Sequence, residues 1–423
     1  MKIVLKNASS STGLTQDIKI ENGLVTEIGS ISEQGVDCSG LIVLPGFVDV
    51  HTHLREPGFE ASETILTGSR SAAAGGYTAV LAMANTAPVS DNRELVEEVH
   101  ELGQLADYVY VQPIGAVTKN LAGQELSDIA GMHSSRANVR VFSDDGVCVF
   151  DAQLMEKALN EVKKFGGVIA QHAQDPLLTP GAQMNQGPLA TELGLRGWPA
   201  EAEERIIERD AMLAKKTGSR LHVCHLTTAG AVEIVRWAKG QGIAITAEVT
   251  PHHLLLTEEL VRSYDPVYKV NPPLRRKEDT IALQEALIDG TIDVIGTDHA
   301  PHSAEKKECE WDNAAFGMVG LEHAASVAQK VLVESGASGW ERLETVMSSA
   351  PAKISGLIDH GEISVGAQAN LTLIDPEAKR VISPITNSKS SNNPFAGIEL
   401  PGEVVMTIYR GRFTVLDRKL VRK

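Results

Sequence analysis

The chain has 423 residues, which is long for one domain and predicts a large core with an accessory module. Hydrophobic residues make up 43% and charged residues 22%, which excludes a disordered, collagen-like or disulfide-scaffold chain. The 39 Lys and Arg against 55 Asp and Glu leave a net charge of −16, and the basic runs at 275–277 and 306–307 are short. We therefore expect no binding to nucleic acid, because an acidic surface repels phosphates.

Features that report on the cellular compartment indicate a reducing, aqueous one. The four cysteines are scattered and form no CxxC pair. The first residues lack the apolar segment of a signal peptide, and no stretch approaches about 18 uncharged apolar residues. We expect a cytoplasmic protein with no membrane segment.

The start of the chain is β-rich, and a repeating pattern of strands and helices follows it. Short β-forming runs at 2–5, 18–21 and 24–28 predict a small sheet. From residue 41, apolar β-branched runs alternate with helix-length segments, of which 151–164 and 200–216 carry apolar residues at helical spacing. The runs lie at 41–50, 77–83, 108–117, 138–145, 167–173, 220–227, 244–253 and 291–302. Eight such units predict an α/β fold of the TIM (β/α)8 barrel type, and an open doubly wound sheet is the alternative.

The β-rich texture returns after residue 356. A β-rich start and a β-rich end around a barrel predict one small composite β domain made from both termini. We expect residues 1–45 to form its N-terminal part, 46–355 the barrel, and 356–423 its C-terminal part. The Asn- and Ser-rich stretch at 385–395 is predicted to be a loop.

Polar residues gather at the ends of the predicted barrel strands, where this fold places its active sites. His51 and His53 are two residues apart, so on a strand both imidazoles face the same side. Alone, this pair is explained equally well by a metal site and by solvent-facing turn histidines. Four more strands end in imidazole or carboxylate groups, namely Asp144 and Asp145, His172, His225, and Asp298 with His299 and His302.

So many titratable groups at one rim favour a divalent metal site, because burying them without a cation would leave uncompensated polar atoms. Imidazole with carboxylate suits Zn²⁺, or Fe, Ni or Mn, better than Mg²⁺ or Ca²⁺. Four His and two Asp exceed one tetrahedral shell, which favours two ions that share a carboxylate and acidify a bound water. We expect hydrolysis of a carbonyl compound or the reverse condensation. The chain contains neither a GxSxG elbow nor a phosphate-binding GxxxxGK[ST] loop.

Longer segments resemble type I dihydroorotase, a family of the amidohydrolase superfamily. They include PGFVDVHTHLREPG, MANTAPVSD, FSDDGV, EVTPHHLLL, VNPPLR and GTDHAPH, and the likeness extends to SKSSNNPFAGIELPGEV near the C-terminus. The resemblance implies a (β/α)8 barrel that interconverts (S)-dihydroorotate and N-carbamoyl-L-aspartate in pyrimidine biosynthesis. It also implies two Zn²⁺ per chain, one held by His51, His53 and Asp298, the other by His172 and His225, with Asp145 as the bridge.

The bridge is assigned to Asp145 over Asp144 because the family places it directly before the glycine; the two side chains point to opposite faces of a strand. Many amidohydrolases bridge their metals with a carboxylated lysine instead. No lysine occurs between Asn120 and Glu156 here, which separates this chain from hydantoinases and allantoinases.

The substrate of this family carries a carboxylate, so we expect a planar cationic group near the metals, and Arg55 is the candidate. Asp298 is expected to act as general acid and base, taking a proton from the attacking hydroxide that bridges the metals and passing it to the ring nitrogen. The resemblance implies further substrate contacts from His53, Leu54, Asn85, Asn271 and His302, and from the backbone of Phe316 and Gly317. For Asn85 and Asn271 the alternative is turn formation beside Pro88 and Pro272, while His252 and His253 are interpreted as structural.

Two other functions remain open from the sequence. One is a different cyclic amidohydrolase, such as an allantoinase or hydantoinase. The other is a non-catalytic scaffold for aspartate transcarbamoylase, although such chains have lost the metal ligands that are all present here. An active enzyme can also bind aspartate transcarbamoylase, and we expect a homo-oligomer.

Overall fold

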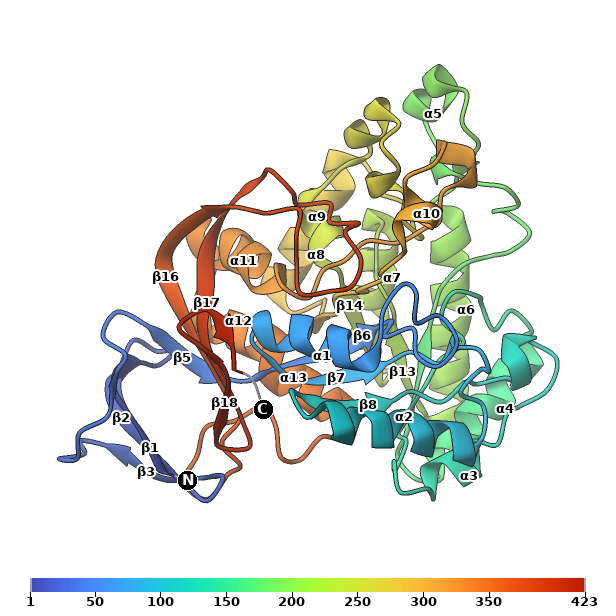
Figure 1. Cartoon of the computed structure of the whole chain (residues 1–423). Coiled ribbons are helices and arrows are strands. Elements are labelled where there is room, and N and C mark those ends of the chain that lie inside the picture. Colours follow the sequence, from blue (N-terminus) through green and yellow to red (C-terminus); the bar gives the residue numbers. More distant parts are fainter. Residues whose placement is uncertain (1, 422–423) are drawn as a thin grey trace.

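Parallel strands, each followed by helical or looped chain, form the larger part of the computed structural model, which describes residues 2–421 (Figure 1). β6, β7 and β8 pair in one parallel group, and β9, β10, β13, β14 and β15 pair in another. Their bounds are Phe47–Thr52, Tyr77–Ala82, Tyr110–Pro113, Val141–Phe142, Val168–Gln171, Arg220–Val223, Ile245–Val249 and Val294–Ile295. Two parallel bridges, Gly115 to Phe142 and Thr52 to His299, join the groups into a ring. The (β/α)8 barrel is therefore confirmed, and the open doubly wound alternative is wrong.

A buried carboxylate also ties the first barrel strand to the segment after the last. Asp49 accepts hydrogen bonds from the backbone N–H of Thr297 at 3.0 Å and from the Thr297 hydroxyl. It accepts a third from the N–H of His51 at 3.1 Å. Because a buried carboxylate needs several donors, this contact fixes the register at which the barrel closes.

The strands read as continuous apolar runs because both of their faces are covered. Every residue of β7 is buried, as expected for a parallel strand with side chains inside the barrel and helices outside. The helices named in Figure 1 that follow barrel strands are α1 (Ile65–Ala74), α2 (Arg93–Ala106), α3 (Ile129–His133), α4 (Ala152–Lys163), α6 (Glu201–Thr217), α7 (Ala229–Gly240), α8 (Pro251–Leu255) and α9 (Lys277–Asp289). Later in the chain come α10 (Ala304–Lys307), α11 (Ala324–Ala328), α12 (Trp340–Glu344) and α13 (Ala350–Ser355).

The two helices predicted from periodicity are confirmed as α4 and α6. In α4 the buried residues Leu154, Met155, Ala158 and Val162 recur every three or four positions and form one face. The Asp151 side chain caps this helix by accepting from the Leu154 N–H at 2.8 Å. Among residues 2–421, no helix is long and apolar enough to cross a membrane.

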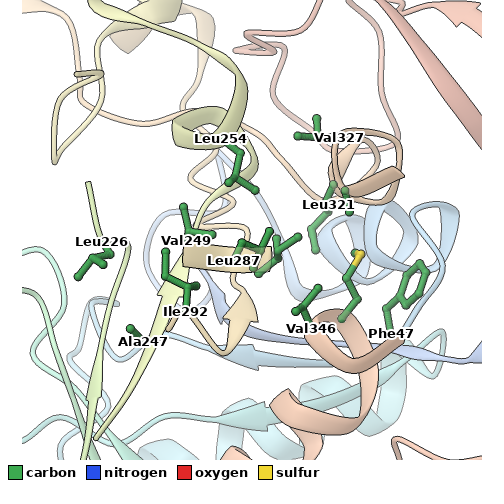
Figure 2. Packing of buried hydrophobic residues seen from close by; sticks show 14 of the residues in the cluster. Phe47, Leu226, Ala247, Val249, Leu254, Leu287, Ile292, Leu321, Val327 and Val346 are labelled. Atoms are coloured by element: carbon green, nitrogen blue, oxygen red, sulfur yellow. The ribbon is translucent and has the colours of Figure 1, made fainter. Parts of the chain in front are cut away.

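The hydrophobic core lies between the barrel strands and the helices around them. Figure 2 shows Val249 of β14 close to Leu287 of α9, with Leu321 and Val346 farther from the strand. Such side chains hold the strand ends in place by close packing, which leaves the rim free to carry polar groups.

The strands of the second sheet come from both ends of the chain, as predicted for the composite β domain. Its order is β19-β18-β17-β16-β5-β1-β2-β3, with β4 on β1, and Figure 1 shows the blue and red strands side by side. The bounds are β1 Lys2–Ser9, β2 Thr15–Glu21, β3 Leu24–Gly29, β4 Val36–Asp37, β5 Ile42–Pro45, β16 Leu371–Val381, β17 Glu399–Tyr409, β18 Arg412–Leu416 and β19 Lys419–Leu420.

The predicted strand at 41–50 is wrong as a single strand. Its first half is β5, which pairs with β16 through Leu44 and Thr372, while the second half is β6 of the barrel. The chain passes between them at Gly46, where a Cβ atom would lie 2.2 Å from the Thr78 side chain. Both halves are apolar and buried, so hydrophobicity alone does not mark the break.

Candidate metal centre and substrate pocket

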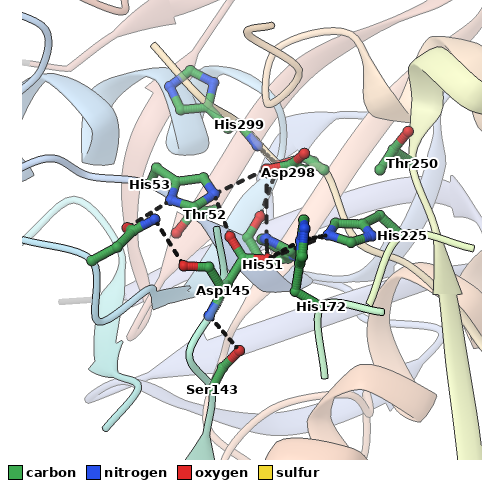
Figure 3. Close-up of polar contacts among 12 residues, drawn as sticks. His51, Thr52, His53, Ser143, Asp145, His172, His225, Thr250, Asp298 and His299 are labelled. Carbon is green, nitrogen blue, oxygen red and sulfur yellow. Dashed lines mark hydrogen bonds and ion pairs between the residues drawn. The ribbon is translucent and has the colours of Figure 1, made fainter. Parts of the chain in front are cut away.

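Six predicted ligands converge at one rim of the barrel, as Figure 3 shows. They come from the C-terminal ends of five strands, and all are buried. The ligands are His51 and His53 at the end of β6, Asp145 after β9, His172 after β10, His225 after β13, and Asp298 after β15.

The Asp145 carboxylate lies between two pairs of histidines. Its Oδ1 is 3.3 Å from His172 Nδ1, 3.3 Å from His225 Nε2 and 3.5 Å from His51 Nε2. Its Oδ2 is 3.3 Å from His53 Nε2. Donor atoms of Asp145 thus belong to two groups close enough to hold an ion, one with His51 and His53 and one with His172 and His225.

Asp298 joins the first of these groups. Its Oδ1 lies 3.0 Å from His53 Nε2 and 3.5 Å from His51 Nε2. Asp298 and His225 both have a positive φ, 44° and 33°, a backbone region that side chains other than glycine rarely adopt. Such strain at strand ends is typical of functional sites, where the surrounding structure holds a side chain in a required direction.

The electrostatic field at this rim favours cations. Burial alone would raise the pKa of Asp145, but His51, His172 and His225 hold that pKa well below its ordinary value. Burial opposes a charge on His51 too, yet Glu248, Asp145 and Asp298 raise the pKa of its imidazole well above the ordinary value. The carboxylates are therefore anionic at neutral pH and attract positive charge to their common centre.

The residues fit a divalent metal ion. His51 Nε2 is buried and, within the described part of the chain, has no hydrogen-bond partner, although it points at Asp145 and Asp298. A buried ring nitrogen without a partner is costly unless it binds a cation. Imidazole and carboxylate are the donor set of Zn²⁺ and related transition metals.

Asp144 lies apart from this cluster, which agrees with the choice of Asp145 made from the sequence. Its Oδ1 accepts from the backbone N–H groups of Val117 at 2.7 Å and Thr118 at 3.0 Å. Asp144 thus connects the loop after β8 to the loop after β9, and its burial raises its pKa.

Arg55 and His302 lie together beside the centre. Arg55 Nε donates to the Pro301 carbonyl at 3.1 Å, and its Nη2 is 3.3 Å from His302 Nε2. His302 Nε2 donates to the Phe316 carbonyl at 2.7 Å. Burial and the nearby Arg55 lower the pKa of His302 to about 3, so this imidazole is neutral, and burial lowers the pKa of Arg55 to about 10, which leaves it charged at neutral pH.

The two predicted asparagines contact metal-ligand side chains or their neighbours. Asn85 Oδ1 accepts from His53 Nδ1 at 2.9 Å, and its Nδ2 donates to the Asp145 carbonyl at 3.3 Å. Asn271 Nδ2 donates to Gln174 Oε1 at 3.3 Å, and the same oxygen accepts from His172 Nε2 at 2.8 Å. In both cases the hydrogen bonds orient a histidine side chain, as partners of metal ligands commonly do.

Leu54 and Gly317 are more restricted than the sequence suggested. The Leu54 side chain is buried in the core beside Gly68, so a substrate contact would have to come from its backbone. The Gly317 N–H donates to the Lys269 carbonyl at 2.9 Å. In a hydrogen bond between Gly317 and a substrate ring, the glycine would therefore be the acceptor, through its carbonyl oxygen.

Asn392 is a residue of this site that sequence reasoning missed. Its Oδ1 accepts from the His302 N–H at 3.1 Å, and its Nδ2 donates to the carbonyls of Ala300 at 2.9 Å and Gly317 at 3.1 Å. The stretch 385–395 contains no helix or strand, as predicted, but Asn392 is buried at the barrel rim. A polar residue in a polar segment carries no local signal of such burial.

The barrel with its histidine and carboxylate cluster defines the chain as an amidohydrolase of the TIM-barrel type. Among solved structures, L-hydantoinase (dihydropyrimidinase) from Arthrobacter aurescens is similar with a TM-score of 0.89 at 26% identity, covering 100% of this chain and 97% of that one. Dihydropyrimidinase from Brevibacillus agri has the same fold, with a TM-score of 0.87 at 24% identity over 100% of this chain and 96% of that chain.

Sequence comparison gives the family. Residues 40–231 match the family model described as dihydro-orotase-like. The chain is 56% identical to the dihydroorotase of Streptomyces coelicolor, over 99% of each chain. It is 49% identical to that of Mycobacterium tuberculosis, over 96% of each chain. The chain belongs to the dihydroorotase family.

Proposed function

We propose that the chain hydrolyses the ring amide of (S)-dihydroorotate reversibly to N-carbamoyl-L-aspartate. The observation that carries this proposal is the position of Asp145, with one oxygen toward His53 and the other toward His172 and His225, in a chain of this family. The complete set of donors argues against a non-catalytic scaffold.

The proposed centre holds two Zn²⁺. His51, His53 and Asp298 would hold one ion, His172 and His225 the other, and Asp145 would contact both. When bound, the pair would acidify a water and polarise the amide carbonyl. The remaining chemistry belongs to side chains of the chain itself.

Asp298 is positioned to move the proton. Its carboxylate is buried within 3.0 Å of His53, and although burial opposes ionisation, His51 and His53 keep its pKa below the ordinary value. It is therefore ionised at neutral pH, able to accept a proton from the attacking water and to return it to the leaving ring nitrogen. In the reverse direction the same carboxylate passes the proton back.

Arg55 is positioned to bind the substrate carboxylate. It stays charged beside the neutral His302, and its Nε is engaged by the Pro301 carbonyl, which fixes the direction of the guanidinium. A planar cation matches a carboxylate with two parallel hydrogen bonds. Phe316 and Gly317 would offer carbonyl oxygens to the ring N–H groups.

A hydantoinase is the second candidate, because the Arthrobacter L-hydantoinase shares the fold at a TM-score of 0.89. The absence of a lysine between Asn120 and Glu156 argues against it, since a carboxylated lysine cannot form there. The higher identity to dihydroorotases, 56%, points the same way.

The test combines metal analysis with a substrate panel. Purified protein is expected to carry close to two zinc ions per chain and to open dihydroorotate, with hydantoin and allantoin as parallel substrates. Metal-replete protein that ignores dihydroorotate but opens hydantoin would transfer the assignment to the second candidate. Protein that binds no divalent metal after apo-reconstitution would remove the proposed centre.

Assembly and location are proposals carried by the family resemblance. We propose a cytoplasmic homo-oligomer that can also bind aspartate transcarbamoylase. Light scattering of the chain alone, and then mixed with the transcarbamoylase of the same cell, tests both: a monomer in each experiment would contradict the proposal.

A further inference from the structure

Glu248 is a buried carboxylate in β14 that neither the sequence reasoning nor the proposed mechanism uses. It is 0% exposed, and it lies in a strand that is otherwise apolar over its buried positions. A carboxylate in such a place is expensive unless several donors satisfy it.

The donors of Glu248 belong to the metal centre. Its Oε1 accepts from His51 Nδ1 at 2.5 Å and from the backbone N–H of His225 at 3.1 Å. Its Oε2 accepts from His222 Nε2 at 3.1 Å, and His222 Nδ1 lies 2.8 Å from the Thr246 hydroxyl. One carboxylate therefore contacts the first barrel strand and the chain after β13, each of which supplies a ligand to a different proposed ion.

The hydrogen bond between Glu248 and His51 decides which ring nitrogen of His51 is available to a metal ion. Because the Glu248 carboxylate accepts at Nδ1, that nitrogen keeps its proton, and Nε2 is the nitrogen that would give its lone pair to a metal ion. That Nε2 is the buried nitrogen that points at Asp145 and Asp298. Without Glu248, the ring could exchange tautomers or rotate.

The eighth strand makes room for this carboxylate. Gly296 follows β15, and a Cβ atom there would lie 2.5 Å from Glu248 Oε2 and 2.7 Å from its carboxyl carbon. Glycine at this position is thus required by the side chain opposite, and an alanine would displace the carboxylate without removing its charge.

We propose that Glu248 is a positioning residue of the metal centre, which sets the tautomer and direction of His51 and holds the backbone of His225. The inference rests on the proposed metal function. The Cys224 thiol lies close enough to His51 and Glu248 for the three side chains to hold an ion together. Both Glu248 oxygens already accept hydrogen bonds, from His51, His222 and the His225 N–H, so Glu248 is assigned as hydrogen-bond acceptor.

The experiment titrates metal-free protein with Co²⁺ and follows its visible absorption bands, which report the ligand geometry without any turnover. Glu248→Gln is expected to weaken Co²⁺ binding by about 10- to 100-fold and to change the band shape. Gly296→Ala is expected to act in the same direction while the charge is kept, and it carries the test if Glu248→Gln does not fold.

The matched control is Glu203→Gln, a second buried carboxylate of the barrel region. Glu203 accepts from the Thr227 N–H at 2.7 Å and lies 3.7 Å from Arg275, and neither of these partners is a proposed ligand. Glu203→Gln should lower the unfolding temperature, while the Co²⁺ affinity and the absorption bands stay as in wild type. Equal Co²⁺ binding by Glu248→Gln, Gly296→Ala and Glu203→Gln would overturn the positioning role, whereas wild type that binds no Co²⁺ would overturn the proposed centre itself.

Discussion

Replacing Asp298 with asparagine isolates the proton-transfer step. The substitution keeps the size of the side chain and one oxygen acceptor, but it removes the charge and the basicity of a carboxylate that lies 3.0 Å from His53 Nε2. A positioned general acid or base contributes about 10²- to 10⁴-fold to a rate. At 1.36 kcal/mol for each tenfold change, the barrier should rise by about 3–5 kcal/mol.

The donors of the second group, Asp145 with His172 and His225, do not include Asp298. We therefore expect Asp298→Asn to retain part of its metal, while kcat falls by about 10²- to 10⁴-fold both for ring opening and for ring closure. The assay follows dihydroorotate absorbance alongside metal content per chain. Asp144→Asn is the control, because that neighbouring carboxylate contacts Val117 and Thr118 and should affect stability more than turnover. A kcat close to wild type in Asp298→Asn would refute the proton-transfer role.

Further predictions concern the substrate pocket and the response to pH. Arg55→Gln should raise KM for dihydroorotate by about 10- to 100-fold, because a charge-assisted hydrogen bond contributes about 1.5–3 kcal/mol; steady-state kinetics in which kcat falls and KM does not would contradict this. Asn392→Ala removes three hydrogen bonds to the segments around His302 and Gly317, so KM should rise and the unfolding temperature fall together, measured on one preparation. Burial lowers the pKa of Lys307 to about 7 from 10.5, so the folded chain binds fewer protons than the unfolded chain between these values, and stability is lost as pH falls from 10.5 toward 7. Between pH 9 and pH 7 the loss of unfolding free energy amounts to about 2–3 kcal/mol. Lys307→Met should abolish this loss in denaturant unfolding; an unfolding free energy that depends on pH in the variant as it does in wild type would exclude Lys307 as the source. Ring closure consumes a proton, so cyclisation of carbamoyl-aspartate should be faster at acidic pH and ring opening faster at alkaline pH, and parallel pH profiles of the two directions would contradict that expectation.

Local patterns predicted the barrel because its strands are buried on both faces and separated by helices with one apolar face. The α4 and α6 helices were predicted in this way. The same patterns did not separate β5 from β6, since hydrophobicity is continuous through Pro45 and Phe47. The break depends on two different partner strands, β16 for β5 and β7 for β6, and both lie outside this apolar run.

The sequence by itself determined which reactive groups are present: the histidines and carboxylates that end successive strands, and the absence of a lysine between Asn120 and Glu156. These follow from residue type and from the two-residue repeat of a strand, which are local properties. Only the tertiary structure decided how each donor is oriented, through Glu248 on His51, Asn85 on His53 and Asn392 on His302. The reason is that a hydrogen bond selects its partner by distance in space, and barrel closure joins residues as far apart in the chain as Asp49 and Thr297, 248 positions.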